Sequence, residues 1–147
     1  MIRVAFVFNA GKLSGILTRI FTGCSCYHVA FVDEERGLMY DMNLLRRRRP
    51  WPHYADERVI VLDAPVPVPR AYLEERLTRD DARYGVLDYC LFALRPLYHL
   101  VGKSTRNAGG TICSEMVASD LQANGWSAEF AEVPSPCQLF WTLGGAR

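Results

Sequence analysis

The order of hydrophobic and polar positions divides the chain into a strand-rich first half and a helix-rich second half. Runs rich in β-branched and aromatic residues predict strands in the first half. These runs cover residues 2–8, 27–32, 38–42 and 58–62. A five-residue polar turn, DEERG, separates the second run from the third. We therefore expect those two strands to form a β-hairpin.

Helical spacing of apolar residues dominates the second half, with one short example before the hairpin. The predicted helices cover residues 13–21, a segment from Ala71, the very apolar segment 86–99, residues 113–124 and a short stretch after Pro136. Pro96 would bend or end the third of these helices, and Gly125 would end the fourth. Strands followed by helices predict an α+β fold with an antiparallel sheet.

Length, composition and charge narrow the class of protein. A chain of 147 residues that is 50% hydrophobic suits a single folded domain, residues 1–147. A net charge of +1 gives the molecule no general preference for nucleic acid or membrane. No apolar run approaches the roughly 18 residues of a membrane span. The N-terminal segment resembles a strand more than a signal peptide, so the expected compartment is the cytoplasm.

Five cysteines are present, an odd number without a signal peptide, and this does not favour a disulfide framework. The C-x-C pair at Cys24 and Cys26 has no matching second pair, so a zinc site is not expected either. Cys90 lies in an apolar run and is typical of a buried small residue. The remaining two cysteines are Cys113 and Cys137.

Cys113 lies at the predicted start of a helix, just after the glycine pair Gly109 and Gly110. The first turn of a helix has unpaired N–H groups and the positive end of the dipole, which favour a thiolate. The same N–H groups can hold an oxyanion, and the glycines let the backbone approach a substrate. Cys113 also falls on or beside the apolar face of its helix. From spacing alone, a nucleophile and a buried apolar residue both stay open.

A nucleophilic cysteine needs a base, and His28 has the most rigid predicted setting of the three histidines. His53 lies in a proline-rich loop and His99 beside a proline, so both are weaker candidates. Asp41 sits on the next predicted strand, where cross-strand neighbours are about 5 Å apart and can orient an imidazole. The alternatives are a hydrogen-bonded sheet histidine for His28 and an exposed strand residue for Asp41.

Two motifs resemble those of the circularly permuted NlpC/P60 papain-like cysteine hydrolases, the YiiX/YebB-like group. That group has an early strand histidine in a pattern like S-H-V-x-[IFL]. Its nucleophile comes late, at a helix start, in a pattern like C-S-E-[LM]-V. Here the corresponding segments are CYHVAFV at 26–32 and CSEMVASDL at 113–121. The resemblance spans roughly residues 5–142, and the late motif is its most specific part.

The resemblance implies a permuted papain-like domain in which Cys113 is the nucleophile and His28 is the base. Asp41 matches the group's polar third residue only by its place on the following strand. Tyr27 replaces the usual small residue before the histidine, and strict strand alternation would point it to the opposite face from His28. The tyrosine ahead of the nucleophile corresponds to Tyr84, which either assists the oxyanion or only packs.

The remaining candidates for oxyanion or substrate binding are Ser114, Arg46 and Trp51. Ser114 falls in the first helical turn, where capping free N–H groups is its simplest role. Four consecutive arginines, Arg46–Arg49, form a predicted loop near the site. They either attract an anionic substrate or partner or are simply solvated. Trp51 beside them either walls a pocket or packs over the sheet edge.

The implied activity is hydrolysis of an amide bond in a peptidoglycan-type peptide or a protein, with no metal, cofactor or specific nucleic acid. One alternative is a lipid or thioester acyl hydrolase or acyltransferase, in which the helix 86–99 lines an acyl pocket. Another is a non-catalytic binding module that uses the arginine loop. A virus-encoded protein of this kind would act in the host cytoplasm or from the virion. The sequence does not identify the substrate or the oligomeric state.

Overall fold

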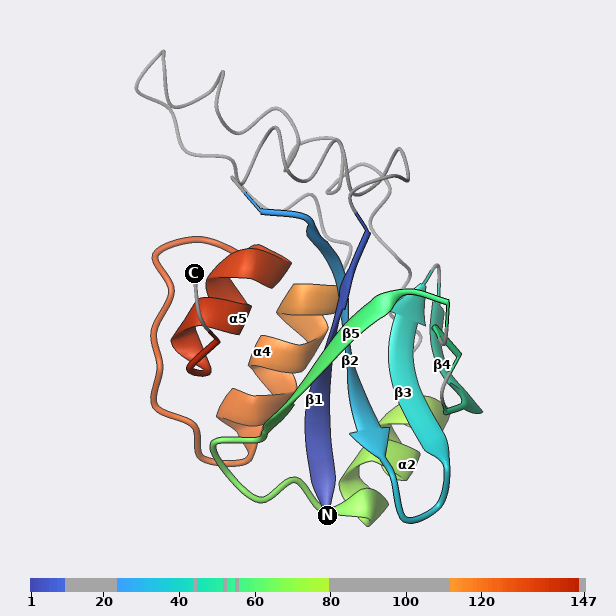
Figure 1. Cartoon of the computed structure of the whole chain (residues 1–147). Helices are drawn as coiled ribbons and strands as arrows, with labels where there is room; N and C mark the ends of the chain where they lie inside the picture. The colour runs from blue at the N-terminus through green and yellow to red at the C-terminus, as the bar shows by residue number, and fades with distance from the viewer. Residues whose placement is uncertain (10–23, 44, 52, 55, 80–111, 146–147) are drawn as a thin grey trace.

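The computed structural model describes residues 1–9, 24–43, 45–51, 53–54, 56–79 and 112–145. Five strands in these ranges form one antiparallel sheet in the order β4-β3-β2-β1-β5 (Figure 1). They are β1 (Ile2–Phe8), β2 (Cys26–Asp33), β3 (Leu38–Asn43), β4 (Leu45–Pro50) and β5 (Arg58–Asp63). The helices described are α2 (Arg70–Arg79), α4 (Cys113–Ala123) and α5 (Pro136–Thr142).

The predicted α+β class, with an antiparallel sheet, is confirmed. Four predicted strands and the helices starting near Ala71, Cys113 and Pro136 are present within one or two residues of their expected bounds. Gly125 follows α4 with a φ of 100°, a left-handed conformation that glycine adopts readily, and so ends the helix as expected. The predicted helices at 13–21 and 86–99 lie outside the described residues.

The arginine run forms the edge strand β4, so the prediction of a loop there was wrong. Each of its residues pairs with β3, from Asn43 opposite Leu45 to Leu38 opposite Pro50. An edge strand can carry charges on both faces, and such charges discourage pairing with further chains. Because side chains alternate along a strand, Arg46 and Arg48 of β4 lie on one face of the sheet and Arg47 and Arg49 on the other.

The two faces of the sheet are covered differently. The larger core cluster joins β1, β2 and β3 to all three described helices, with Phe6, Phe31, Leu73, Met116 and Leu139 among its fully or almost fully buried members. Figure 1 shows α4 and α5 side by side along that face of the sheet. The other face carries a smaller cluster, Ala5, Ala30, Val32 and Met39, against which Trp51, Tyr54, Val59 and Val61 pack.

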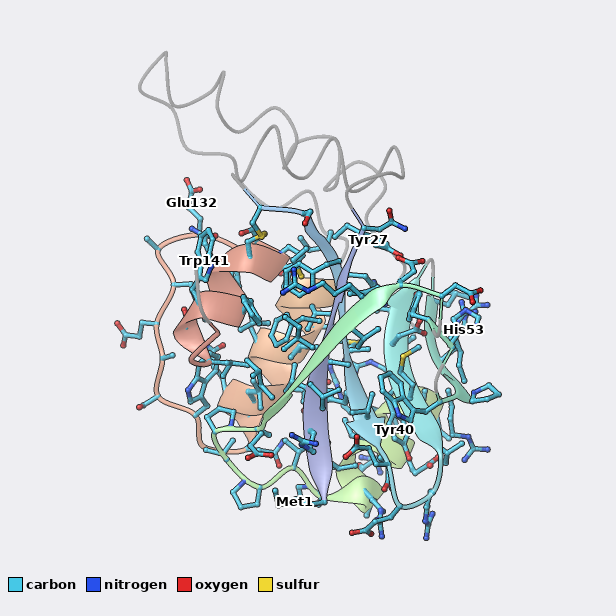
Figure 2. All side chains as sticks on the ribbon, in the orientation of Figure 1. Met1, Tyr27, Tyr40, His53, Glu132 and Trp141 are labelled. Atoms are coloured by element: carbon cyan, nitrogen blue, oxygen red, sulfur yellow. A yellow bond between two sulfur atoms is a disulfide. The ribbon has the colours of Figure 1, made fainter. Side chains whose placement is uncertain are left out.

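A β-bulge interrupts β2 just before His28. Val7 pairs with His28 and Phe8 with Cys26, so Tyr27 has no partner on β1. Cys26 consequently joins the helix-side cluster together with Val29, which strict alternation would not allow. We expected Tyr27 and His28 to face opposite sides of the sheet because side chains alternate along a strand. The bulge interrupts that alternation at Tyr27. The Tyr27 hydroxyl, near one end of the sheet in Figure 2, donates a 2.6 Å hydrogen bond to Glu57.

A disulfide joins Cys24, just before β2, to Cys137 in α5, with a Cα–Cα distance of 6.2 Å. This corrects the expectation that the cysteines stay unpaired. Its partners are 113 residues apart, and sequence spacing does not reveal such connectivity. Disulfides are rare in the cytosol, so this bond does not favour the expected cytoplasmic compartment. Among the described cysteines, Cys26 and Cys113 are free and buried.

Candidate active site

His28 and Asp41 lie where the ladder between β2 and β3 has ended. The paired positions are Phe31 with Tyr40, Val32 with Met39 and Asp33 with Leu38. Both strands continue beyond this ladder, and the same register would set Asp41 opposite Ala30. Since side chains alternate along a strand, His28 then lies two residues further on the same face as Asp41. The two side chains are diagonal neighbours, a spacing that long side chains bridge.

The contact between them is an ion pair. His28 Nε2 lies 3.5 Å from Asp41 Oδ2, and the two side chains are 8% and 0% exposed. The geometry is too long for a good hydrogen bond, so Oδ2 has no hydrogen-bond donor among the described residues. Asp41 thus lies beside a ring nitrogen of His28, as the sequence predicted.

Arg49 is the second cation at Asp41, and the sequence pointed to it only as one member of the arginine run. Its Nε lies 3.3 Å from Asp41 Oδ1 and 3.2 Å from Oδ2. A fully buried carboxylate needs such partners to remain charged. Arg49 also contacts His53, with 3.1 Å between Nη1 and Nε2. The alternation of side chains along β4 would have placed Arg49 on the same face as Asp41. That alternation could be used only once the arginine run was known to be a strand.

Cys113 is the first residue of α4 and is 4% exposed. The N-cap residue, Ile112, provides no side-chain hydrogen bond to the first turn. The helix contacts both β2 and β3, the strands that carry His28 and Asp41, and Cys113 interacts with His28. The thiol lies in the first turn, at the positive end of the helix dipole, as the sequence predicted.

The protonation of His28 reflects both neighbours. Burial alone lowers its pKa, but the charge of Cys113, side-chain contacts with Asp41 and Cys113, and the charge of Asp41 together outweigh burial. The net result is a pKa raised from 6.5 to about 9. At neutral pH the ring is therefore an imidazolium held between a sulfur and a carboxylate. The three residues that the sequence predicted to act together are brought together.

An aromatic ring covers this group. The Tyr54 ring centroid lies 5.4 Å from that of His28, and the His53 ring packs edge-on against the tyrosine at 4.9 Å. The sequence had left open whether the aromatic residues after the arginine run wall a pocket or pack on the sheet. Tyr54 packs on the sheet, because it belongs to the apolar cluster on this face.

Two sequence candidates are occupied elsewhere. Arg46 is 3% exposed and points to the helix side, where its Nη1 lies 2.5 Å from Asp120 Oδ2. The buried pair explains why this arginine is absent from the group around His28. Trp51 packs on the smaller apolar cluster, and its backbone N–H donates a 2.8 Å hydrogen bond to Gly37. The expectation that these two residues bind substrate is not supported by these contacts.

Ser114 follows the cysteine in the first turn of α4 and is fully buried. Its Oγ has no hydrogen-bond partner among the described residues, and no capping bond comes from Ile112. A role in oxyanion or substrate binding stays a prediction. Tyr84, Gly109 and Gly110, the other residues predicted around the nucleophile, lie outside the described residues.

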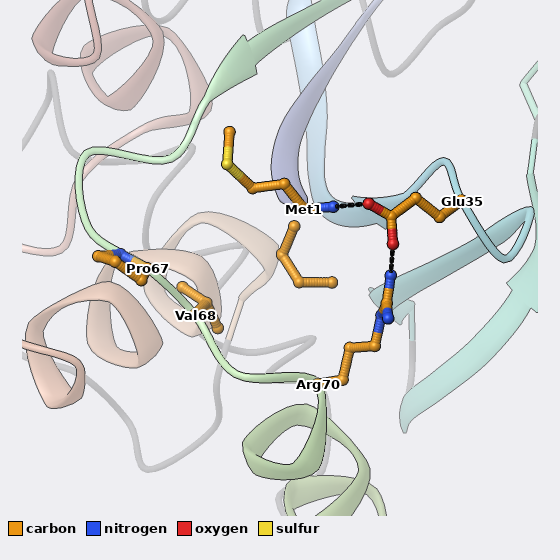
Figure 3. Close-up of a pocket in the computed structure, with 6 residues that line it drawn as sticks. Met1, Glu35, Pro67, Val68 and Arg70 are labelled. Carbon is orange, nitrogen blue, oxygen red and sulfur yellow. Dashed lines mark hydrogen bonds and ion pairs between the residues drawn. The ribbon is translucent and has the colours of Figure 1, made fainter.

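A pocket of about 340 Å³ opens at the other end of the sheet (Figure 3). Its charged groups satisfy one another, since Glu35 pairs with both the Met1 amino group and Arg70. Asp33, also paired with Arg70, is five residues along β2 from His28, roughly 17 Å at strand spacing. This pocket is therefore separate from the cysteine site.

The described ranges contain neither a metal-binding cluster nor a membrane-spanning helix. No cluster of three or more histidine, cysteine or acidic side chains there has the arrangement of a metal site. No helix in those ranges is long and apolar enough to span a bilayer.

In comparisons with known proteins, no family model matches the chain, and no curated protein or solved structure is significantly similar to it.

Proposed function

We propose that the chain is a cysteine hydrolase on a permuted papain-like fold. Cys113 is the nucleophile, His28 is the general acid and base, and Asp41 orients His28. The observation that carries the proposal is that one imidazole interacts with both the Cys113 thiol and the Asp41 carboxylate. A nucleophile, a base and an orienting acid in contact are the parts needed for acyl transfer through a covalent intermediate.

The reaction has two halves. The Cys113 thiolate attacks the substrate carbonyl carbon, a C–S bond forms, and the carbonyl π electrons move onto oxygen. When the C=O bond re-forms, the C–N bond breaks and the leaving amine takes a proton from His28, which leaves a thioester on Cys113. His28 then takes a proton from water as the water attacks the thioester. Collapse releases the acid and restores the thiolate and the imidazolium.

An amide of a peptide is the preferred substrate class. An amine leaves only as it gains a proton, and an imidazolium with a pKa of about 9 holds that proton at neutral pH. Esters and thioesters pass through the same steps but depend less on proton transfer to the leaving group. A binding role for the whole arginine run has less support, because Arg46 and Arg48 pair with Asp120 and Glu74.

Alkylation of Cys113 by iodoacetamide tests the proposal without a known substrate. The rate is measured from pH 5 to pH 10 and assigned by mass spectrometry in the wild type and in His28→Ala. We expect fast labelling that persists near pH 6 and is lost in His28→Ala, because a thiolate–imidazolium pair reacts where an ordinary thiol with pKa about 8.5 does not.

Cys26 is the matched control in the same molecule. It is also free and buried, but burial and the charge of Cys113 raise the pKa of its thiol far above the ordinary value. It should therefore label slowly at every pH in the range. Labelling of Cys113 no faster than that of Cys26, with no effect of His28→Ala, would falsify the hydrolase proposal. Peptide amides and acyl esters would then be screened with the active protein to fix the bond it cleaves.

A further inference from the structure

We propose that Tyr54 is a further catalytic residue, whose phenol hydroxyl donates a hydrogen bond to the substrate carbonyl oxygen as Cys113 attacks. This inference rests on the proposed hydrolase function and adds a donor to it. The starting observation is that the Tyr54 ring lies 5.4 Å from the His28 ring, tilted by 51°. His28 in turn interacts directly with Cys113, so the tyrosine and the sulfur are both neighbours of one imidazole.

The Tyr54 hydroxyl is free to donate. Among the described residues no hydrogen bond involves this hydroxyl, whereas Tyr27 and Tyr40 donate to Glu57 and Glu74 at 2.6 Å and 2.7 Å. A half-buried tyrosine normally finds a partner for its O–H, whereas the direct contacts of Tyr54 within the described ranges are ring contacts and apolar packing. A phenol without a partner, held next to a nucleophile and its base, has the position expected of a group that bonds to substrate.

The packing of Tyr54 fixes its ring in place. It contacts His28 and, at 4.9 Å, His53, and it packs against the apolar cluster of Ala30 and Met39. Oxyanion donors act by being oriented before the reaction, because no energy is then spent on turning them during it. A ring held by two histidines and the sheet meets that requirement.

The hydroxyl also keeps its proton. Burial, followed by the negative charge of Asp41, raises the pKa of Tyr54 well above that of a free phenol, and the Cys113 charge acts in the same direction. Tyr54 is therefore a donor throughout the range in which the thiolate–imidazolium pair exists. In the attack, the C–S bond forms, the carbonyl electron pair moves onto oxygen, and the Tyr54 O–H bonds to that oxygen without losing its proton.

Two reagents separate this role from the others. Iodoacetamide alkylates Cys113 by displacement of iodide, so no oxyanion forms. p-Nitrophenyl acetate acylates Cys113 through a tetrahedral oxyanion and releases p-nitrophenolate, which needs no proton. Tyr54→Phe keeps the ring on His28 and removes only the hydroxyl. We expect it to slow acylation on the order of 100-fold, the usual effect of losing one oxyanion donor, and to leave alkylation within about two-fold.

Cys113→Ala defines the background of both reactions, and far-UV circular dichroism with a thermal melt establishes that each variant is folded. Equal acylation rates in wild type and Tyr54→Phe would overturn the inference. So would a matching fall in both reactions, because Tyr54 would then only position His28. If wild-type Cys113 alkylates no faster than Cys26, the hydrolase proposal has failed and the inference fails with it. Fast alkylation of Cys113 together with an unchanged acylation rate in Tyr54→Phe would contradict the role of Tyr54 and leave the hydrolase proposal standing.

Discussion

Two buried aspartates, Asp120 and Asp41, lie on opposite faces of the same sheet. They differ in how many hydrogen bonds and ion pairs their carboxylates receive. Both carboxylates are fully or almost fully buried. Asp120 receives two contacts from Arg46, a 3.0 Å hydrogen bond from Tyr72, and an ion pair from Arg76 at 3.5 Å. Within the part of the chain that the structure describes, Asp41 has the loose contact with His28 and the pair with Arg49, and its Oδ2 lacks a hydrogen bond there.

The difference fits a structural role for Asp120 and the functional role that we propose for Asp41. The Asp120 network ties α4 to α2, which carries Tyr72 and Arg76, and to β4, which carries Arg46. Such a network gives a single packing arrangement at the cost of desolvating several charges. The Asp41 group keeps an unfilled acceptor, a raised histidine pKa and a free cysteine at the same place. Buried polar atoms without a hydrogen-bond partner are typical of sites that form their remaining hydrogen bonds during a reaction.

The largest effect is expected from Asp120→Asn. Removing this charge leaves the buried guanidinium of Arg46 without its counterion, which costs about 3–5 kcal/mol in the free energy of unfolding. Urea denaturation followed by circular dichroism measures the loss. Below the midpoint of unfolding, the alkylation rate of Cys113 should stay at the wild-type value. A loss under about 1 kcal/mol would remove the distinction drawn between the two acids.

Asp41→Asn is the matched change on the other face. Its partners, His28 and Arg49, are nearer to solvent, so we expect a smaller stability loss of about 1–2 kcal/mol. Activity should fall on the order of 10²- to 10⁴-fold, because the imidazole loses the group that orients and charges it. The upper pH limit of activity should also move down, since Asp41 raises the pKa of His28. Hydrolysis unaffected by this substitution would contradict the assigned role.

A smaller effect concerns the pH dependence of stability. Because the pKa of His28 is raised from 6.5 to about 9 by folding, its stabilising contribution is complete below pH 6.5 and is lost as pH rises to 9. We expect the free energy of unfolding to fall by on the order of 1–3 kcal/mol across that window. Cys113→Ala, which removes the largest cause of the raised pKa, should flatten the profile. Equal slopes in both proteins would count against the ion pair.

The pattern of the sequence predicted most of the described fold because most of its elements have a clear apolar period. β4 has none: its arginines carry no apolar alternation, and only pairing with β3 makes it a strand. The positions of Cys113, His28 and Asp41 followed from motif order and from strand neighbours. Arg49 and Tyr54 depend on the register of β4 and on the path of the loop after it. The local sequence pattern predicts neither the register of β4 nor the path of that loop, so it could not place these two side chains.

The Cys24–Cys137 bond makes the part of the chain that carries the proposed site a covalent ring. Cys113, His28, Asp41 and Tyr54 all lie between the two bonded cysteines. A single cut of the backbone anywhere inside the ring therefore yields one molecule rather than two fragments. The nucleophile and its base would stay linked after such a cut until a reductant opened the bond. Proteolytic nicking alone would thus not separate the two halves of this site.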